Sequence, residues 1–195
     1  FNLVGISNGR GGAASGMLEG NLTKLPALSW RVQGSLKRLG NVQTPDYFLG
    51  NTGTREANYS AAIGWNKPRY GIDVYFSSFN ADLGIFSGSH IGNLTDLQLA
   101  IESDRPRREY DFSYEIGRPY QQVRHNLVKV KSNYRTGADS WLHLTYSLQD
   151  NVRREYDSHI PYNDSIAAVD EAQLNYFVTT QHVEVMWEHN ACRRL

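Results

Sequence analysis

Hydrophobic and polar residues alternate along most of this chain. In the stretch WRVQGSLK, Trp30, Val32 and Leu36 fall on one side, and Arg31 and Lys37 fall on the other. A period of two residues is typical of a β-strand with one apolar and one polar face. The same alternation recurs in YSAAIGW at 59–65, YGIDVYFSS at 70–78, NLVKVKSNY at 126–134 and WLHLTYSLQ at 141–149. A weaker segment around 15–19 and another through 183–187 bring the expectation to about seven strands in an all-β, antiparallel up-and-down fold.

The connections between these strands also alternate, in length. Short connections with turn residues lie near 20–27, 66–69 and 136–139, and long connections cover about 40–56, 81–122 and 150–172. If the strands run up and down, all three long connections lie at the same end. Within the second of them, Thr95 before residues 96–102 predicts a short capped helix.

All four tryptophans, Trp30, Trp65, Trp141 and Trp187, lie towards the expected short-turn end. Outer-membrane barrels combine aromatic girdles with short turns on one side and long loops on the other. A tryptophan beside a turn also closes the end of a soluble core. Alternation alone does not decide whether the apolar face fills an interior or faces lipid. The loop asymmetry favours a transmembrane β-barrel, and a soluble antiparallel barrel or sandwich is the alternative.

The composition narrows the classes of protein further. The 195 residues suffice for one domain, and 20 basic against 20 acidic residues give no indication of nucleic-acid binding. A single cysteine, Cys192, excludes a disulfide framework. No apolar run approaches the ~20 residues of a membrane helix. The chain opens with Phe1 and no targeting segment follows, which we interpret as processing or truncation of that end.

The stretch SLKRLGNVQTPDYFLGNTGTREANYSAAIGW, residues 35–65, resembles a strand–loop–strand unit of TonB-dependent outer-membrane receptors. Its loop contains TPDY and NTG, and Asn58 and Ser60 follow on the returning strand. The stretch FNADLGIFSGSHIGNLTDLQLAI looks like another barrel loop of that family, and the MWEH ending at His189 is similar to its later strands. The resemblance covers nearly the whole chain, as barrel only, because no plug domain or TonB-box segment is visible.

The resemblance implies a parent receptor with a barrel of about 22 strands around an N-terminal plug domain. Residues 1–195 would form a partial barrel with short periplasmic turns and long extracellular loops. Such receptors lie in the bacterial outer membrane and import iron chelates such as siderophores, cobalamin or oligosaccharides. The implied partners are outer-membrane lipid, the plug domain of the same parent chain, the TonB complex and a nutrient ligand. The resemblance implies no enzymatic activity and no cofactor.

The motif RREYD occurs at 107–111 and again at 153–157, in or at the base of two long connections. Arginine offers a planar fork of donors to carboxylate or phosphate, and tyrosine adds a flat apolar contact, so these segments are candidates for binding an anionic ligand. The alternative is that each arginine pairs with a neighbouring acidic residue on a solvated strand extension. The candidates are Arg105, Arg107, Arg108, Tyr110, Tyr114, Arg118 and Tyr120 in the first group, and Arg153, Arg154 and Tyr156 in the second.

A second set of charged residues is expected to face the lumen of the barrel, where it would line a transport path or contact the plug. Its members are Arg31, Lys37, Asp73, Lys129 and Lys131. Ordinary solvation of a polar face is the alternative. His189 and Cys192 have ligand spacing, but two ligands without a third do not make a zinc site. The sequence contains no nucleophile elbow and no glycine-rich phosphate loop, so it predicts no catalysis.

Overall fold

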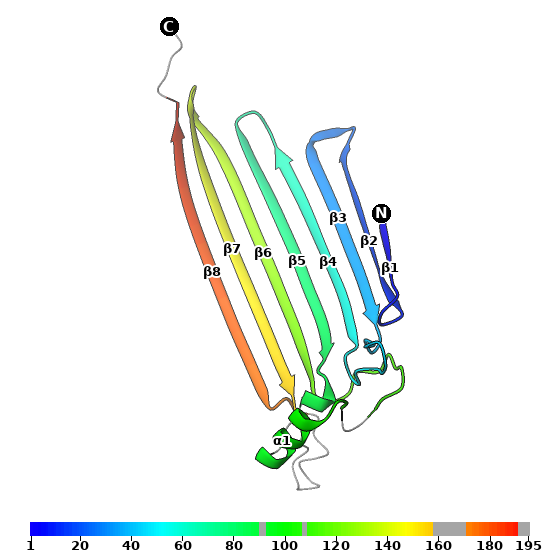
Figure 1. Ribbon diagram of the computed structural model, residues 1–195. Helices are drawn as coiled ribbons and strands as arrows, with labels where there is room; N and C mark the ends of the chain where they lie inside the picture. Colours follow the sequence, from blue (N-terminus) through cyan, green and yellow to red (C-terminus); the bar gives the residue numbers. More distant parts are fainter. Residues whose placement is uncertain (90–92, 107–108, 158–170, 191–195) are drawn as a thin grey trace.

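The chain folds as one eight-stranded antiparallel sheet with a short helix at one end (Figure 1). This computed structural model describes residues 1–89, 93–106, 109–157 and 171–190. Each strand pairs with its neighbours in chain order. The strands are β1 (Asn2–Ile6), β2 (Gly11–Leu22), β3 (Leu25–Leu39), β4 (Thr54–Asn66), β5 (Tyr70–Gly84), β6 (Tyr120–Gly137), β7 (Ser140–Tyr156) and β8 (Leu174–His189).

The expected antiparallel up-and-down topology is confirmed, with eight strands in place of about seven. The additional strand is β1, which has five residues and no apolar–polar alternation in its sequence NLVGI. Among the described residues, β1 and β8 each pair on one side only and not with each other. The sheet is therefore open and does not close into a barrel.

The strands extend further than the apolar alternation indicates. β2 has 12 residues and β6 has 18, whereas strands of globular proteins usually have roughly 3–10. The long connections shrink accordingly to 40–53, 85–119 and 157–173. The alternation stops where polar residues occupy both faces of a strand. Hydrogen bonding between the strands continues there, because water can solvate polar side chains on both faces. The expectation that loops begin at 81 and 150 was therefore wrong.

The two ends of the sheet carry different connections. Short turns at 23–24, 67–69 and 138–139 lie at one end, and the long connections lie at the other, beside the helix (Figure 1). One further connection at the loop end, residues 7–10, is short. Gly9 there adopts a φ of 87°, a conformation that glycine tolerates without steric cost. The expected asymmetry therefore holds for the three long connections but not for this hairpin.

The helix α1 (Leu94–Glu102) lies in the connection between β5 and β6, after a 3₁₀ turn, η1 (Ser87–Ser89). Its N-cap is Asn93 and not the expected Thr95. The Asn93 side chain accepts a hydrogen bond of 2.9 Å from the backbone N–H of Asp96, which is the third helical residue. A short amide side chain at this position satisfies an otherwise unpaired amide of the first turn, so the helix begins one residue before Thr95.

Side chains from several segments pack together at the base of the 40–53 connection. Phe112 contacts Phe48 with ring centroids 5.7 Å apart, and the guanidinium of Arg10 lies 4.5 Å from the Phe112 ring. Asn41 is almost fully buried, and its side chain donates to the backbone oxygen of Asp111 at 3.1 Å. Segments distant in sequence are thus held together above the end of the sheet.

Candidate functional site

The strand register divides the sheet side chains into two faces. Consecutive strand pairs align six apolar residues in one row across the sheet: Trp30, Ile63, Val74, Val130, Tyr146 and Val183. We call the side that carries them the apolar face. The neighbouring residues of each strand point to the opposite side, which we call the polar face.

An apolar belt crosses the half of the apolar face nearest the short turns. It extends from the row of Tyr70, Tyr134, Leu142 and Trp187 to the row of Val32, Ala61, Phe76, Val128 and Leu148. Ser132 and Gln181 are polar exceptions in the belt. On the apolar face of the strands described, no Lys, Arg, Asp or Glu lies between these two rows.

The belt is exposed. The residue exposures of Ile63, Leu144 and Val183 are 52, 44 and 64%. Among the described residues, only Ala81 and Tyr156 are classed as buried hydrophobic residues. A soluble sandwich or closed barrel would enclose such a face in a dry interior, and the described chain has a single layer without one.

Aromatic rings gather at the short-turn end of the belt. Trp65 and Trp187 lie near the ends of β4 and β8 on the apolar face, and Tyr70 and Tyr134 pair across β5 and β6. Trp141 lies at the same end but on the polar face, where it stacks against His143 with ring centroids 6.4 Å apart. The tryptophans do lie towards the short-turn end of their strands, as expected, but Trp141 is on the polar face.

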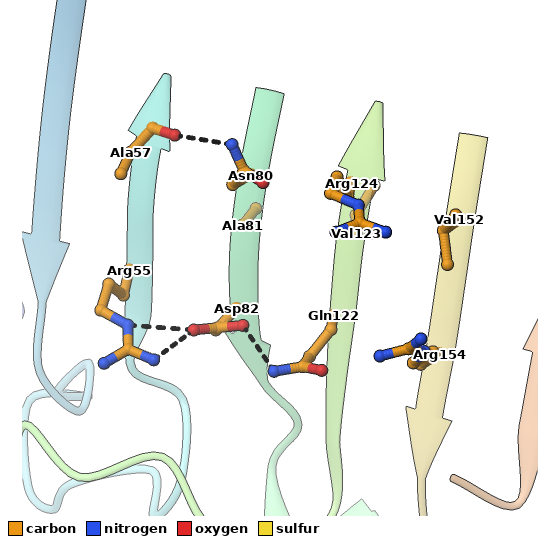
Figure 2. Close-up of a pocket in the computed structure, with 10 residues that line it drawn as sticks. All are labelled: Arg55, Ala57, Asn80, Ala81, Asp82, Gln122, Val123, Arg124, Val152 and Arg154. Atoms are coloured by element: carbon orange, nitrogen blue, oxygen red, sulfur yellow. Dashed lines mark hydrogen bonds and ion pairs between the residues drawn. The ribbon is translucent and has the colours of Figure 1, made fainter. Parts of the chain in front are cut away.

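At the loop end, the same face becomes charged. Arg55, Asp82, Gln122 and Arg154 lie in one row across β4 to β7 (Figure 2). Arg55 Nε donates to Asp82 Oδ2 at 2.9 Å, and Gln122 Nε2 donates to the other carboxylate oxygen at 3.1 Å. With Arg124 from the adjoining row, these side chains line a pocket that we call the arginine pocket.

Two of the three arginines in the pocket lack an acidic partner among the described residues. Arg55 shares the carboxylate of Asp82, whereas Arg124 and Arg154 form no ion pair within the described part of the chain. Ala57 and Val152 add apolar surface to the same pocket. The arrangement offers positive charge next to an apolar edge, which suits a ligand with both characters.

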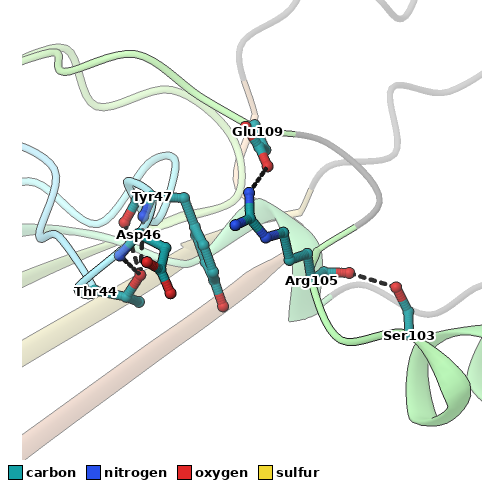
Figure 3. Close-up of polar contacts among 6 residues, drawn as sticks. All are labelled: Thr44, Asp46, Tyr47, Ser103, Arg105 and Glu109. Atoms are coloured by element: carbon teal, nitrogen blue, oxygen red, sulfur yellow. Dashed lines mark hydrogen bonds and ion pairs between the residues drawn. The ribbon is translucent and has the colours of Figure 1, made fainter.

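The first group of predicted ligand residues is dispersed. Arg105 Nη1 donates to Glu109 Oε1 at 3.0 Å, so this arginine pairs with a nearby acid in the way the alternative interpretation expected (Figure 3). Arg107 and Arg108 lie outside the described residues. The ring of Tyr110 packs against Gly50, where a Cβ atom would lie 2.3 Å from the ring.

Tyr114 takes part in the packing of the loop base, although 40% of the residue is exposed. Its ring meets Phe112 edge-on at 4.9 Å, and its hydroxyl donates to the carbonyl oxygen of Arg10. The guanidinium of Arg38 lies 5.1 Å from the Tyr114 ring. These contacts give Tyr114 a role in loop packing.

Three other predicted residues do come together at the end of β6 and β7. Tyr120 and Tyr156 stack with ring centroids 4.2 Å apart, and Arg118 lies 5.3 Å from the Tyr156 ring. The Tyr156 hydroxyl donates to Gln122 Oε1 at 3.2 Å, which connects this stack to the arginine pocket. Arg153 belongs to the polar face and pairs with Glu155. The second RREYD copy lies mostly within β7, and its two arginines point to opposite sides of the sheet.

The five residues expected to face a lumen share the polar face. Arg31 pairs with Glu19 at 2.7 Å, Lys37 pairs with Glu56 at 2.9 Å, and Asp73 accepts a hydrogen bond of 3.0 Å from Asn66. Lys129 and Lys131 have no acidic partner within the described part of the chain and line a shallow pocket with His182 and Glu184. The register thus confirms a common face.

Sequence reasoning missed Arg55, Asp82, Gln122 and Arg124. The sequence did contain an indication of them. Counting in steps of two along each strand from the belt residues places each of the four on the apolar face. Arg124, for example, is four residues before Val128 on β6. A charged residue at a position that shares a face with the apolar residues marks where the apolar part of that face ends.

Within the described ranges, no helix has the length and hydropathy to span a membrane, and no group of three or more His, Cys, Asp or Glu could hold a metal ion. Comparisons of the chain with protein-family models, with curated proteins and with solved structures find no match.

Proposed function

We propose that this chain is a segment of a transmembrane antiparallel β-barrel in the bacterial outer membrane, and that it belongs to a TonB-dependent receptor. In this role it forms part of the wall of an importer for a nutrient such as an iron chelate, cobalamin or an oligosaccharide, and it performs no chemistry of its own. The observation that carries the proposal is the exposed belt, with aromatic rings along one border and charged residues beyond the other.

The exposure of the belt supports lipid as its surroundings. From Tyr70 to Phe76, the apolar side of β5 covers about 20 Å along the strand, which is roughly 15 Å across the membrane at the ~35–45° tilt of outer-membrane strands, so the belt fills part of their ~25 Å apolar band. Soluble proteins rarely expose contiguous apolar surface on this scale. On the loop side the strands continue past the belt by several residues, which allows that end of the sheet to reach water.

The two free edges support a larger barrel. Among the residues that the structure describes, β1 and β8 have no strand partner at the outer sides of the sheet, which leaves backbone donors and acceptors there without a partner strand. In hydrocarbon, each unsatisfied backbone group costs several kcal/mol, so a lipid-embedded sheet has to close. Further strands of a parent chain would complete the wall, with the polar face turned towards a lumen and its plug domain.

The membrane proposal is tested by placing one substitution on each face. Ala61 lies in the belt and Ala62, its neighbour, lies on the polar face. The parent protein that contains this segment, in which the sheet can close, is refolded into phosphatidylcholine vesicles, and insertion is measured by flotation and protease protection during a urea titration. We expect Ala61→Arg to destabilise the inserted state by about 2–4 kcal/mol and Ala62→Arg to leave it nearly unchanged, because only Ala61 would face hydrocarbon.

Equal tolerance of the two substitutions would contradict a lipid-facing belt. So would a wild-type parent protein that stays monodisperse without detergent and does not float with vesicles. That outcome would favour a soluble protein that binds a small ligand or carbohydrate through its loops.

The receptor part of the proposal rests on the family resemblance of the strand–loop–strand unit at 35–65 and is tested separately. It predicts that the parent gene encodes a plug domain before Phe1, together with a segment that contacts the TonB complex. Sequencing the gene upstream checks this expectation. A parent without a plug would leave the chain as barrel wall of another kind.

A further inference from the structure

The arginine pocket lies just beyond the belt, on the same face and towards the loops. Arg124 is four residues along β6 from Val128 at the border of the belt, about 13 Å along an extended strand. Charged side chains are not needed on a surface that faces only hydrocarbon, and long arginine side chains reach readily from an apolar edge into a polar layer. If the belt faces lipid, the pocket lies at the level of the lipid headgroups.

The charge of the pocket is unbalanced. Arg55, Arg124 and Arg154 face a single carboxylate, that of Asp82, which is held by Arg55 and Gln122. Asp150, one row nearer the belt than Arg124, accepts a hydrogen bond from Thr179 at 2.7 Å. Arg124 and Arg154 therefore remain available to an anion, within the described part of the chain.

The shape of the lining favours a phosphate that is part of an amphiphile. Guanidinium groups bind phosphate through paired hydrogen bonds in a fixed geometry. Ala57 and Val152 line the same pocket, so apolar surface is available beside the charged groups. A free anion would gain nothing from this apolar side, whereas a lipid whose acyl chains lie along the belt would contact both.

We propose that the arginine pocket binds the phosphate groups of a lipid headgroup in the outer leaflet, with Arg124 and Arg154 as the principal contacts. This inference rests on the proposed membrane location. It adds a specific lipid site on the outer wall of the barrel, distinct from the nutrient site expected among the loops. Basic pockets at the edge of a membrane-spanning region are a recurrent way of holding anionic headgroups.

The test uses the parent protein that contains this segment, inserted into phosphatidylcholine vesicles that carry increasing amounts of lipid A, a bisphosphorylated glycolipid. Insertion itself is followed by flotation and protease protection in vesicles without lipid A. Binding is followed by energy transfer from the tryptophans to labelled lipid A, and dephosphorylated lipid A is the matched lipid control. Failure to insert would contradict the proposed function, whereas normal insertion with equal binding of both lipids would contradict only this inference.

Substitutions then locate the site. We expect Arg124→Gln with Arg154→Gln to weaken lipid A binding by about tenfold or more, because hydrogen bonds between charged groups are lost. The control is Arg153→Gln, which removes an arginine from the same strand but from the polar face, and its binding should match wild type. Unchanged binding in the double variant, or an equal loss in the control, would overturn the assignment.

Two further measurements distinguish a lipid site from misfolding of the variants and from a site that binds free anions. Asp82→Asn removes the only acid of the pocket and should tighten binding by about threefold, a direction that misfolding does not produce. Inorganic phosphate at millimolar concentration should not displace lipid A. Weaker binding by Asp82→Asn, or displacement by inorganic phosphate, would contradict the lipid site.

Discussion

The two ends of the apolar face differ in chemistry although they belong to the same strands. Near the short turns, β4 and β5 carry Trp65 and Val74 on this face; near the loops, the same sides of these strands carry Arg55 and Asp82. Backbone geometry requires only that alternate residues share a face. A change of residue type along one face therefore reports a change of surroundings along the strand, which we interpret as the passage from hydrocarbon to headgroups.

The polar face shows no comparable change between its ends. Arg31 pairs with Glu19 in the half near the short turns, and Lys37 pairs with Glu56 in the half near the loops. Both ends thus tolerate charge. The contrast between the faces suggests that the polar face meets one aqueous environment throughout, as a lumen would provide.

The largest expected effect comes from introducing charge at the two ends of the apolar face. Ala57 and Ala61 lie on the same face of β4, four residues apart. We expect Ala61→Arg to cost about 2–4 kcal/mol of folding free energy in vesicles and Ala57→Arg to cost about 0–1 kcal/mol, because the penalty falls towards the interface. Urea unfolding of both variants, monitored by tryptophan emission, measures the difference. Equal costs would mean that the two ends do not differ in surroundings.

An intermediate effect is expected in the loop base, which depends on packing within the protein rather than on lipid. Phe112→Ala removes contacts with Phe48, Tyr114 and Arg10, and because the ring is half-buried we expect a local loss of about 1–3 kcal/mol. The Asn41 amide, which donates to Ser113 O at 2.9 Å, should then exchange its hydrogen about tenfold faster or more.

The control for this variant is Phe177→Ala, because Phe177 is 65% exposed on β8, outside the loop base. Exchange at Asn41 should be unaffected by that change. If both variants accelerate exchange equally, the loops do not form a separate packed unit.

The smallest effect is expected on the polar face. Both side chains of the Arg31–Glu19 pair are more than half exposed, so Glu19→Gln should change the unfolding free energy by only about 0.5 kcal/mol or less. Chemical denaturation at low and high salt measures this change. A loss above about 1.5 kcal/mol would indicate that the polar face is closely covered and not solvated.

Much of the sheet could be predicted from the sequence, since the five clearest alternating segments all lie within strands of the expected orientation. The strand β1 could not, because five residues without alternation carry no periodic signal. The N-cap of α1 was misplaced because Asn93 and Thr95 are both suitable capping residues, and only the backbone position decides between them. Tyr114 stays a predicted ligand residue, and the structure adds packing contacts that the sequence did not indicate, because its partner Arg10 is more than a hundred positions earlier in the chain.

By itself, the sequence determined which residues share a side of each strand, because a strand repeats every two residues whatever surrounds it. It also indicated between which strands the long connections lie, though not where each begins, and it placed aromatic residues near the short turns. Only the tertiary structure decided the rows across strands, because register depends on pairing between segments far apart in the chain. Arg55, Arg124 and Arg154 come from three strands, and their meeting in one pocket follows from that register alone.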